Sequence, residues 1–433
     1  MIYLGIGLLL FLLIIGAPVG LALGISGLVG LYMAGGMDAV FGVMNTVPYR
    51  TAASYTLTTL PMFILMAELT SECGIVRELF DAARKWMERL PGGLAIASIF
   101  AAAGMAALSG SSTASAAALS RITVPEMIRN GYKTPVAAGV ITVAGTLAIM
   151  IPPSISLVIY GAVTENSIGK LLIAGILPGV LTATLYILGI YVWSKVKPSD
   201  MPLQSKTGYT WKERFLSLEP LWAFILLASA VLGSMYLGWA TPTEASAVGA
   251  FGALVIPLAR RQINFKQVIH AVQKTLEVTT MIFVIIIGAM VFGYFMTITQ
   301  APQKLIQFIT DLHASPGMVF FMVIILYFIL GCFLDVIAIL LITLPLVYPL
   351  VMSLGFDPIW FGIIVVKLVE IALVTPPLGM NAYVVSATTG VPLETVFKGT
   401  GIMLFFEAVT LALLIFFPVI STWLPSMMFT GVK

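Results

Sequence analysis

Charge is scarce in this chain. Of its 433 residues, 9% are charged and 60% are hydrophobic, whereas soluble domains carry roughly 25% charge. The hydrophobic runs do not alternate with polar residues, and they are much longer than the strands of a membrane barrel. These observations exclude a soluble globular domain and a β-barrel. They predict an all-α, polytopic membrane protein that is embedded in a lipid bilayer.

Residues that carry redox, metal or hydrolytic chemistry are also scarce. Cys73 and Cys332 form no CxxC pair, and His270 and His313 have no metal-ligand neighbours in the sequence. No Ser/His, paired Asp or HExxH arrangement falls in an apolar segment, so we expect no enzyme and no organic cofactor. The net charge of +3 is no indication of nucleic-acid binding. The N-terminus has no early Lys or Arg and reads as a retained first helix rather than a cleaved signal peptide.

What the chain has in abundance is apolar segments that are able to enter a membrane. The segment 2–34 reads as one long tilted helix or as two short ones, because Gly16-Ala17-Pro18 permits either. The segment 79–90 alternates charged and apolar residues and predicts an amphipathic helix at the membrane interface, or alternatively a solvated surface helix. The apolar segments lie at 2–34, 52–70, 93–108, 111–128, 135–165, 170–193, 217–238, 240–259, 276–297, 317–334, 336–352, 358–389 and 398–424.

Four basic stretches separate some of these segments, and the positive-inside rule places all four on the cytoplasmic side. They lie at 77–89, 129–133, 195–214 and 260–274. Because segments 93–108 and 111–128 have basic stretches on both sides, we expect them to form a re-entrant helical hairpin with its tip near 109–113. Segments 317–334 and 336–352 predict a second hairpin that enters from the opposite side, with its tip near 331–335.

Two proline pairs interrupt otherwise apolar segments. Pro152-Pro153 and Pro376-Pro377 lie 224 positions apart, and the same spacing relates Pro18 to Pro242 and Gly131 to Gly355. Together with the basic stretches, this predicts an inverted-topology repeat of the kind found in secondary transporters. We expect the first repeat at 1–200, a cytoplasmic linker at 201–214 and the second repeat at 215–433.

The first hairpin tip is rich in hydroxyl groups. Residues 108–115 contain five of them beside Gly110. Hydroxyl and carbonyl oxygens suit a dehydrated Na⁺, and helix N-termini that begin at a tip present amides to an anion. The alternative is that the small residues only permit close helix packing, with the hydroxyls bonded to nearby carbonyls. The clustering of five hydroxyls favours a binding role.

Each proline pair predicts a broken helix, at 152–154 and at 375–381, because proline removes an amide donor and frees carbonyls one turn earlier. Ser154 and Asn381 then offer side chains to a ligand. A simple kink is the alternative for either break. Two breaks at equivalent points, each expected to face a hairpin tip, favour binding.

Four charged residues in apolar segments are ambiguous. Asp335 is the only carboxylate at the second tip and is expected to pair with a cation or substrate, or to cap the returning helix. Lys367 and Glu370 lie three apart and form either a structural ion pair or part of the transport machinery. Arg121, inside the first hairpin, either attracts a carboxylate or extends to the interface.

The chain resembles the large membrane subunit of TRAP (tripartite ATP-independent periplasmic) transporters nearly from end to end. Several of the matching motifs are weak alone, but their order and spacing are specific. They are Leu60-Pro-Met-Phe63, Leu90-Pro-Gly-Gly-Leu94, Leu108-Ser-Gly-Ser-Ser112, Pro125 with Gly131-Tyr132, Ile151-Pro-Pro-Ser154, Ala174-Gly-Ile-Leu-Pro-Gly179, Thr241-Pro-Thr-Glu-Ala245, and Thr375-Pro-Pro-Leu-Gly379 with Asn381. Arg121 departs from the small or apolar residues expected at its position.

The resemblance implies an elevator-type, Na⁺-driven importer of small organic acids (dicarboxylates, sugar acids or keto acids) in the bacterial inner membrane. It also implies two partners, a small four-helix membrane subunit and a periplasmic substrate-binding protein. By position it implies Na⁺ ligands at Ser109, Gly110, Ser112 and Pro152 for one site, and at Gly331, Cys332, Asp335, Thr375, Pro377 and Gly379 for the other. It implies a substrate between the tips, near Ser111, Thr113, Ser154, Asp335 and Asn381.

Other functions remain to be weighed. A stand-alone, ion-coupled organic-anion carrier of the same architecture would need no binding protein, and only an assay with and without that protein separates the two. An intramembrane enzyme is disfavoured by the missing catalytic patterns. A channel is disfavoured because closed tips from both sides suit alternating access better than a continuous pore.

Overall fold

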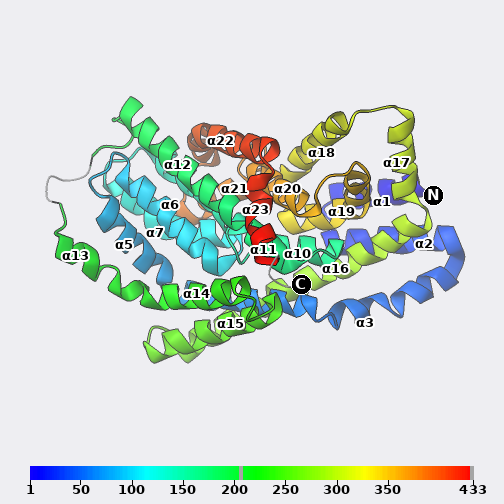
Figure 1. The fold of residues 1–433 in the computed structure, drawn as a ribbon, viewed down its shortest axis with the longest axis horizontal. Helices are drawn as coiled ribbons and strands as arrows, with labels where there is room; N and C mark the ends of the chain where they lie inside the picture. Colours follow the sequence, from blue (N-terminus) through cyan, green and yellow to red (C-terminus); the bar gives the residue numbers. More distant parts are fainter. Residues whose placement is uncertain (204–207, 430–433) are drawn as a thin grey trace.

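The structure is a computed structural model, and it describes residues 1–203 and 208–429. Part of the predicted linker, 204–207, lies outside the described residues. The first half of the chain is helical throughout, and Figure 1 shows its course in blue to green. Its elements are α1 (Ile2–Ile14), α2 (Val19–Met44), α3 (Val47–Ala52), η1 (Thr56–Thr58), α4 (Thr59–Glu72), α5 (Ile75–Met87), α6 (Gly93–Ser109), α7 (Ser112–Arg129), α8 (Thr134–Ala144), α9 (Leu147–Met150), α10 (Ile155–Thr164), α11 (Ile168–Ala174) and α12 (Ile176–Val196).

The second half is also helical, and the described part of the chain contains no strand, so the all-α prediction is confirmed. Its elements are α13 (Trp211–Leu216), η2 (Glu219–Leu221), α14 (Trp222–Tyr236), α15 (Pro242–Ala259), α16 (Phe265–Ile298), α17 (Ala301–Asp311), α18 (Pro316–Gly331), α19 (Val336–Ser353), α20 (Pro358–Leu373), α21 (Met380–Thr389), α22 (Leu393–Phe416) and α23 (Val419–Phe429).

Helices of the two halves correspond at the 224-residue spacing of the proline pairs. Helices α7 and α19 are both 18 residues long, and they begin at Ser112 and Val336. The helix before each of them ends at a short connection, and the helix after each of them leads to a proline pair. The same series, helix–tip–helix followed by a broken helix, therefore occurs twice in the chain.

The composition of the helices is that of a multi-pass membrane protein. Within the described residues, eight helical stretches are long and apolar enough to cross a membrane, or nine if the bent pair of η1–α4 and α5 is taken as one span. That pair bends by 64° at the short connection after Glu72.

Helix α5 buries Ile75, Leu79 and Phe80, whereas its charged residues lie on the other face, as the amphipathic pattern predicts. It ends at Met87, three residues before the predicted end.

Several boundaries differ from those read off the sequence. The segment 2–34 forms two helices, α1 and α2, because Gly16 and Pro18 separate them. Helix α16 begins inside the basic stretch 260–274, where Asn264 and Gln267 form a capping box. The predicted linker 201–214 is not entirely irregular, since α13 starts at Trp211 behind a Thr210–Glu213 capping box.

Close helix packing brings the broken helices of the two halves together. Figure 1 shows α10, α11, α20 and α23 in the middle of the molecule, with α5, α6 and α12 on one side and α1, α2 and α16 on the other. Helices α8 and α22 approach so closely at Gly139 and Gly399 that a Cβ on either glycine would overlap the backbone of the other helix. This contact fixes the first broken helix against the second half of the chain.

Candidate functional site

The first hairpin turns at two residues. Helix α6 ends at Ser109 because Gly110 adopts a left-handed conformation, with φ of 62°. Ser111 is extended, and its hydroxyl accepts a hydrogen bond from the amide of Ala114 at 3.4 Å, which caps α7. The connection is therefore two residues long, and α7 begins directly at the tip.

This first tip lies against the first proline break. Helix α9 ends at Met150, the Pro152-Pro153 bond is cis, and α10 begins at Ile155. A Cβ placed on Gly110 would lie 2.5 Å from the carbonyl oxygen of Pro153. Ordinary van der Waals contact begins near 3.4 Å. Only glycine permits this approach of the tip to the carbonyl groups of the break.

The second hairpin has the same relation to the second break. Helix α18 ends at Gly331, and Asp335 caps α19 by accepting a hydrogen bond from the amide of Ile337 at 3.1 Å. The Sγ of Cys332 lies 3.7 Å from the carbonyl oxygen of Pro376, in the break between α20 and α21. The Pro376-Pro377 bond is also cis. Each tip thus faces the break of its own half.

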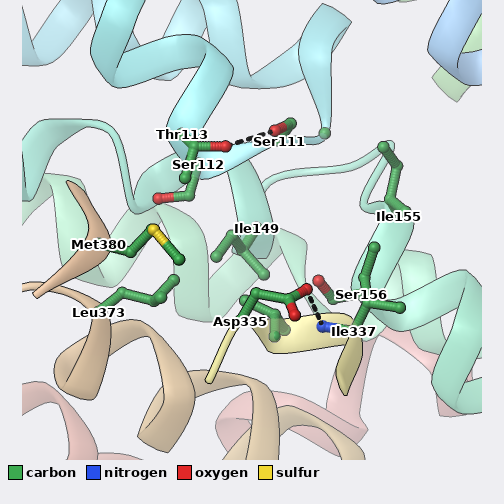
Figure 2. Close-up of a pocket in the computed structure, with 12 residues that line it drawn as sticks. Ser111, Ser112, Thr113, Ile149, Ile155, Ser156, Asp335, Ile337, Leu373 and Met380 are labelled. Atoms are coloured by element: carbon green, nitrogen blue, oxygen red, sulfur yellow. Dashed lines mark hydrogen bonds between the residues drawn. The ribbon is translucent and has the colours of Figure 1, made fainter. Parts of the chain in front are cut away.

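The two tips share one cavity of about 90 Å³. Figure 2 shows Ser111 and Thr113 on one side of this cavity and Asp335 on the other. The hydroxyls of Ser111 and Thr113 lie 3.4 Å apart. The cavity is lined by Gly110, Ser111, Ser112, Thr113, Ile149, Ile155, Ser156, Asp335, Val336, Ile337, Leu373 and Met380. It combines hydroxyls, one carboxylate and an apolar floor.

A layer of buried polar groups lies behind the cavity and joins the two halves. The amide nitrogen of Asn381 donates to the hydroxyl of Ser112 and to the carbonyl of Thr142, the latter at 3.4 Å. Asn381 is completely buried, and its Oδ1 has no hydrogen-bond partner among the described residues. Ser109 and Ser115 share a hydrogen bond of 2.6 Å. The second break is therefore tied directly to the first tip.

The predicted site residues divide into two groups. Gly110, Ser111, Ser112, Thr113 and Asp335 line the common cavity. The others do not contact it but lie around the tips and breaks; they are Ser109, Pro152, Ser154, Gly331, Cys332, Thr375, Pro377, Gly379 and Asn381.

Two of the residues outside the cavity bond to nearby backbone instead. Ser154 is buried and caps α10, where it accepts from the amide of Leu157 at 3.3 Å. Thr375 donates its hydroxyl to the carbonyl of Ile371 at 2.6 Å. In this structure both side chains complete a helix end rather than facing the cavity.

Sequence reasoning missed much of the cavity wall. Ser156 is the second residue of α10. The apolar lining residues come from segments that are apolar almost throughout: Ile149, Ile155, Val336, Ile337, Leu373 and Met380. Nothing in the sequence separates these residues from their neighbours. The lone Ser156 two residues after Ser154 was the only available signal.

The structure shows the surroundings of Lys367, Glu370 and Arg121, whose roles the sequence left open. Lys367 and Glu370 form an ion pair of 2.9 Å, and Glu407 on α22, which the sequence analysis overlooked, contacts the same ammonium. Arg121 is exposed on the surface of α7 and does not line the cavity. An arginine contact with a bound substrate therefore has no support in this structure.

Paired helical hairpins, two broken helices and a polar cavity between them define the chain as a multi-pass helical membrane protein of transporter type. The YdaH transporter of Alcanivorax borkumensis has the same fold, with a TM-score of 0.61, 14% sequence identity and coverage of 91% of this chain and 90% of that chain.

The family follows from the sequence itself. Residues 6–420 match the family of the tripartite ATP-independent periplasmic transporter, DctM component. The chain belongs to this family, which confirms the resemblance seen in its motifs.

Two relatives illustrate the range of the family. The C4-dicarboxylate TRAP transporter large permease protein DctM of Pseudomonas aeruginosa is 38% identical over 87% of this chain and 88% of its own length. The sialic acid TRAP transporter large permease protein SiaM of Vibrio cholerae is 29% identical over 96% of each chain. The chain is accordingly a subunit of a TRAP transporter, a family of permeases rather than enzymes.

Proposed function

We propose that this chain is the large membrane subunit of a Na⁺-coupled symporter that imports a small organic acid across the bacterial inner membrane. Its partners are a small four-helix membrane subunit and a periplasmic substrate-binding protein that delivers the acid. The tripartite family supports the two partners. The relatives named for a C4-dicarboxylate and for sialic acid support an organic acid as substrate.

The observation that carries the proposal is the contact of each hairpin tip with the proline break of its own half. Gly110 lies against the carbonyl of Pro153, and Cys332 lies against the carbonyl of Pro376. Broken helices of this kind supply carbonyl oxygens to Na⁺ in secondary transporters. The first Na⁺ is held by Ser109, Gly110, Ser112 and Pro152, and the second by Gly331, Cys332, Asp335, Thr375, Pro377 and Gly379.

The organic acid binds in the cavity between the tips. The N-terminal ends of α7 and α10 open toward this region, and such helix ends attract a carboxylate. The hydroxyls of Ser111 and Thr113 donate to the carboxylate from one side. Asp335 on the other side repels it unless a cation is present, so Na⁺ binds at the second tip before the substrate. Ser154 and Asn381 hold the walls of the cavity in place from behind.

The driving force is sufficient for accumulation. Each Na⁺ that crosses a potential of 100 mV contributes about 2.3 kcal/mol, in addition to its concentration gradient. Two Na⁺ ions with one monocarboxylate carry one net positive charge inward, so the potential assists uptake. Two Na⁺ ions with one dicarboxylate are electroneutral, and the Na⁺ gradient alone then drives uptake.

Alternating access follows from the repeated halves. The two halves, 1–200 and 215–433, lie in the membrane with opposite orientations, so each hairpin closes the site from one side. The hairpins and broken helices move together, as in an elevator, because Asn381 and the Gly139–Gly399 contact join them.

Uptake into proteoliposomes tests the proposal. The chain is reconstituted with its small subunit, and a panel of radiolabelled organic acids that includes a C4-dicarboxylate is offered in Na⁺ or in choline. We expect uptake only in Na⁺ and only with the binding protein. Equal uptake in choline would refute Na⁺ coupling. Na⁺-driven uptake without any binding protein would identify a stand-alone carrier instead.

A further inference from the structure

A cluster of three ionisable side chains lies in the interior of the chain, apart from the cavity at the tips. Lys367 and Glu370 come from α20, and Glu407 comes from α22; we call them the Lys367 cluster. All three side chains have 0% exposure. The Nζ of Lys367 lies 2.9 Å from Glu370 and 2.5 Å from Glu407. None of the three lines the tip cavity.

Hydroxyl groups from two further helical segments surround the cluster. The ammonium of Lys367 donates to the hydroxyl of Thr182 on α12 at 3.3 Å. The hydroxyl of Thr146, which immediately precedes α9, lies 3.3 Å from a carboxylate oxygen of Glu407 and 2.7 Å from the carbonyl oxygen of Val143. The same hydroxyl lies 3.2 Å from the phenolic oxygen of Tyr186 on α12. The cluster therefore continues into a chain of hydroxyls rather than ending at the ion pairs.

The charges of the cluster do not balance. One ammonium faces two carboxylates, and the phenol of Tyr186 is joined to them through the hydroxyl of Thr146. Within residues 1–203 and 208–429, no further carboxylate, ammonium, guanidinium or imidazole bonds to these three side chains, whether from α9, α12 or α22. Glu370 Oε1 has no hydrogen-bond partner among those residues. A net negative charge on fully buried side chains is unfavourable, and binding one proton removes it.

We propose that the Lys367 cluster is a proton-binding site, in which one exchangeable proton shared by Glu370 and Glu407 neutralises the second carboxylate. The step is the reversible protonation of a carboxylate to a carboxylic acid, and it needs no other reactant. The proton belongs to the pair of glutamates rather than to either one alone.

The position of the cluster links it to both broken helices. Lys367 and Glu370 lie on α20, the helix that ends at the break at 375–381, and Thr146 directly precedes α9, the short helix that ends at the break at 152–154. Thr146 and Glu370 are themselves related by the 224-residue spacing. Protonation therefore acts on the helices that lead to both breaks, at a point separate from the proposed Na⁺ ligands.

Infrared difference spectroscopy of the purified full chain between neutral and high pH tests the proposal, because a protonated carboxyl has its own C=O stretching band. We expect one such band in the wild type, lost at high pH, and absent from both Glu370→Gln and Glu407→Gln. Asp335→Asn and the exposed Glu277→Gln serve as controls and should keep the band. Absence of the band from the wild type, or its persistence in both cluster variants, would overturn the proposal.

Two further measurements guard against misfolded variants. Carbon-13 labelling of the glutamate carboxyls in the wild type should shift the band, whereas labelling of aspartate should not; a shift with aspartate alone would overturn the proposal. Each single glutamine variant leaves one carboxylate opposite Lys367, so both should melt near the wild-type temperature. The double variant leaves the ammonium unpaired and should melt clearly lower, and equal melting of all three would contradict the charge balance.

Discussion

Substitution of Gly110 by alanine should weaken Na⁺ binding at the first tip. The new Cβ would lie 2.5 Å from the carbonyl oxygen of Pro153, so the tip must retreat by about 0.9 Å to reach the 3.4 Å at which ordinary contact begins. Binding constellations tolerate displacements of about 0.5 Å. An overpacked contact of this kind typically costs about 1–3 kcal/mol, which corresponds to a roughly 5- to 150-fold loss of affinity.

The assay is the Na⁺-dependent rise in melting temperature of the purified chain, with choline keeping the ionic strength constant. A ligand at 100 times its Kd stabilises the folded state by about 2.7 kcal/mol, and a hundredfold loss of affinity reduces this to about 0.4 kcal/mol. Gly390→Ala is the matched control. Gly390 is also left-handed, with φ of 73°, but no atom lies within 4 Å of the position of its Cβ.

Both substitutions should lower the melting temperature in choline, because alanine in the left-handed conformation costs about 1–2 kcal/mol. Only Gly110→Ala should also lose most of the response to Na⁺ at the first site. A wild-type response in Gly110→Ala would refute the reasoning. An equal loss in both variants would show that backbone strain, and not the contact with Pro153, is responsible.

Three further predictions concern other parts of the chain. Asp335→Asn should keep the cap of α19 and melt near the wild-type temperature, whereas Asp335→Ala should lose about 1 kcal/mol of folding stability. Both variants should lower Na⁺-driven uptake at least tenfold. Unchanged uptake in either would contradict a role for the carboxylate. Gly139→Ala should destabilise the chain by about 3 kcal/mol through overlap with Gly399, whereas Gly401→Ala, with open space on the same helix as Gly399, should be neutral or stabilising in thermal melts. The hydrogen bond from Lys133 lowers the pKa of Asp200 in the folded chain. The stabilisation of the fold by this carboxylate is therefore fully present above the pKa of an aspartate in the unfolded chain, about 3.9, and is lost as the pH falls through the lower pKa of the folded chain. The difference in melting temperature between wild type and Asp200→Asn should therefore shrink below about pH 4, and a difference independent of pH would refute this.

The sequence could predict those residues that interrupt an otherwise apolar segment. The proline pairs, the hydroxyls at the first tip and Asp335 stand out in apolar segments because each is costly there without a partner. The structure brings the tips and breaks together at these positions. Glu407 was equally visible as a carboxylate in an apolar segment, and the same argument would have found it.

Other features gave no local signal. The apolar wall of the cavity, such as Leu373 and Met380, depends on which helix faces which, and the packing of distant helices decides that. The start of α16 was missed because its basic residues suggested a loop, although the Asn264–Gln267 capping box marked a helix start. Ser154 was expected to face a ligand, but its hydroxyl caps α10, which its position directly after a break also permits.

The most direct test of the central claim is equilibrium binding of radioactive Na⁺ to the purified chain. We expect saturable binding of two Na⁺ ions per chain. Gly110→Ala should remove most of the binding at one site, and Asp335→Ala should remove most of it at the other. Absence of saturable Na⁺ binding to the wild type, or unchanged binding in both variants, would contradict the claim that each hairpin tip and its proline break form a Na⁺ site.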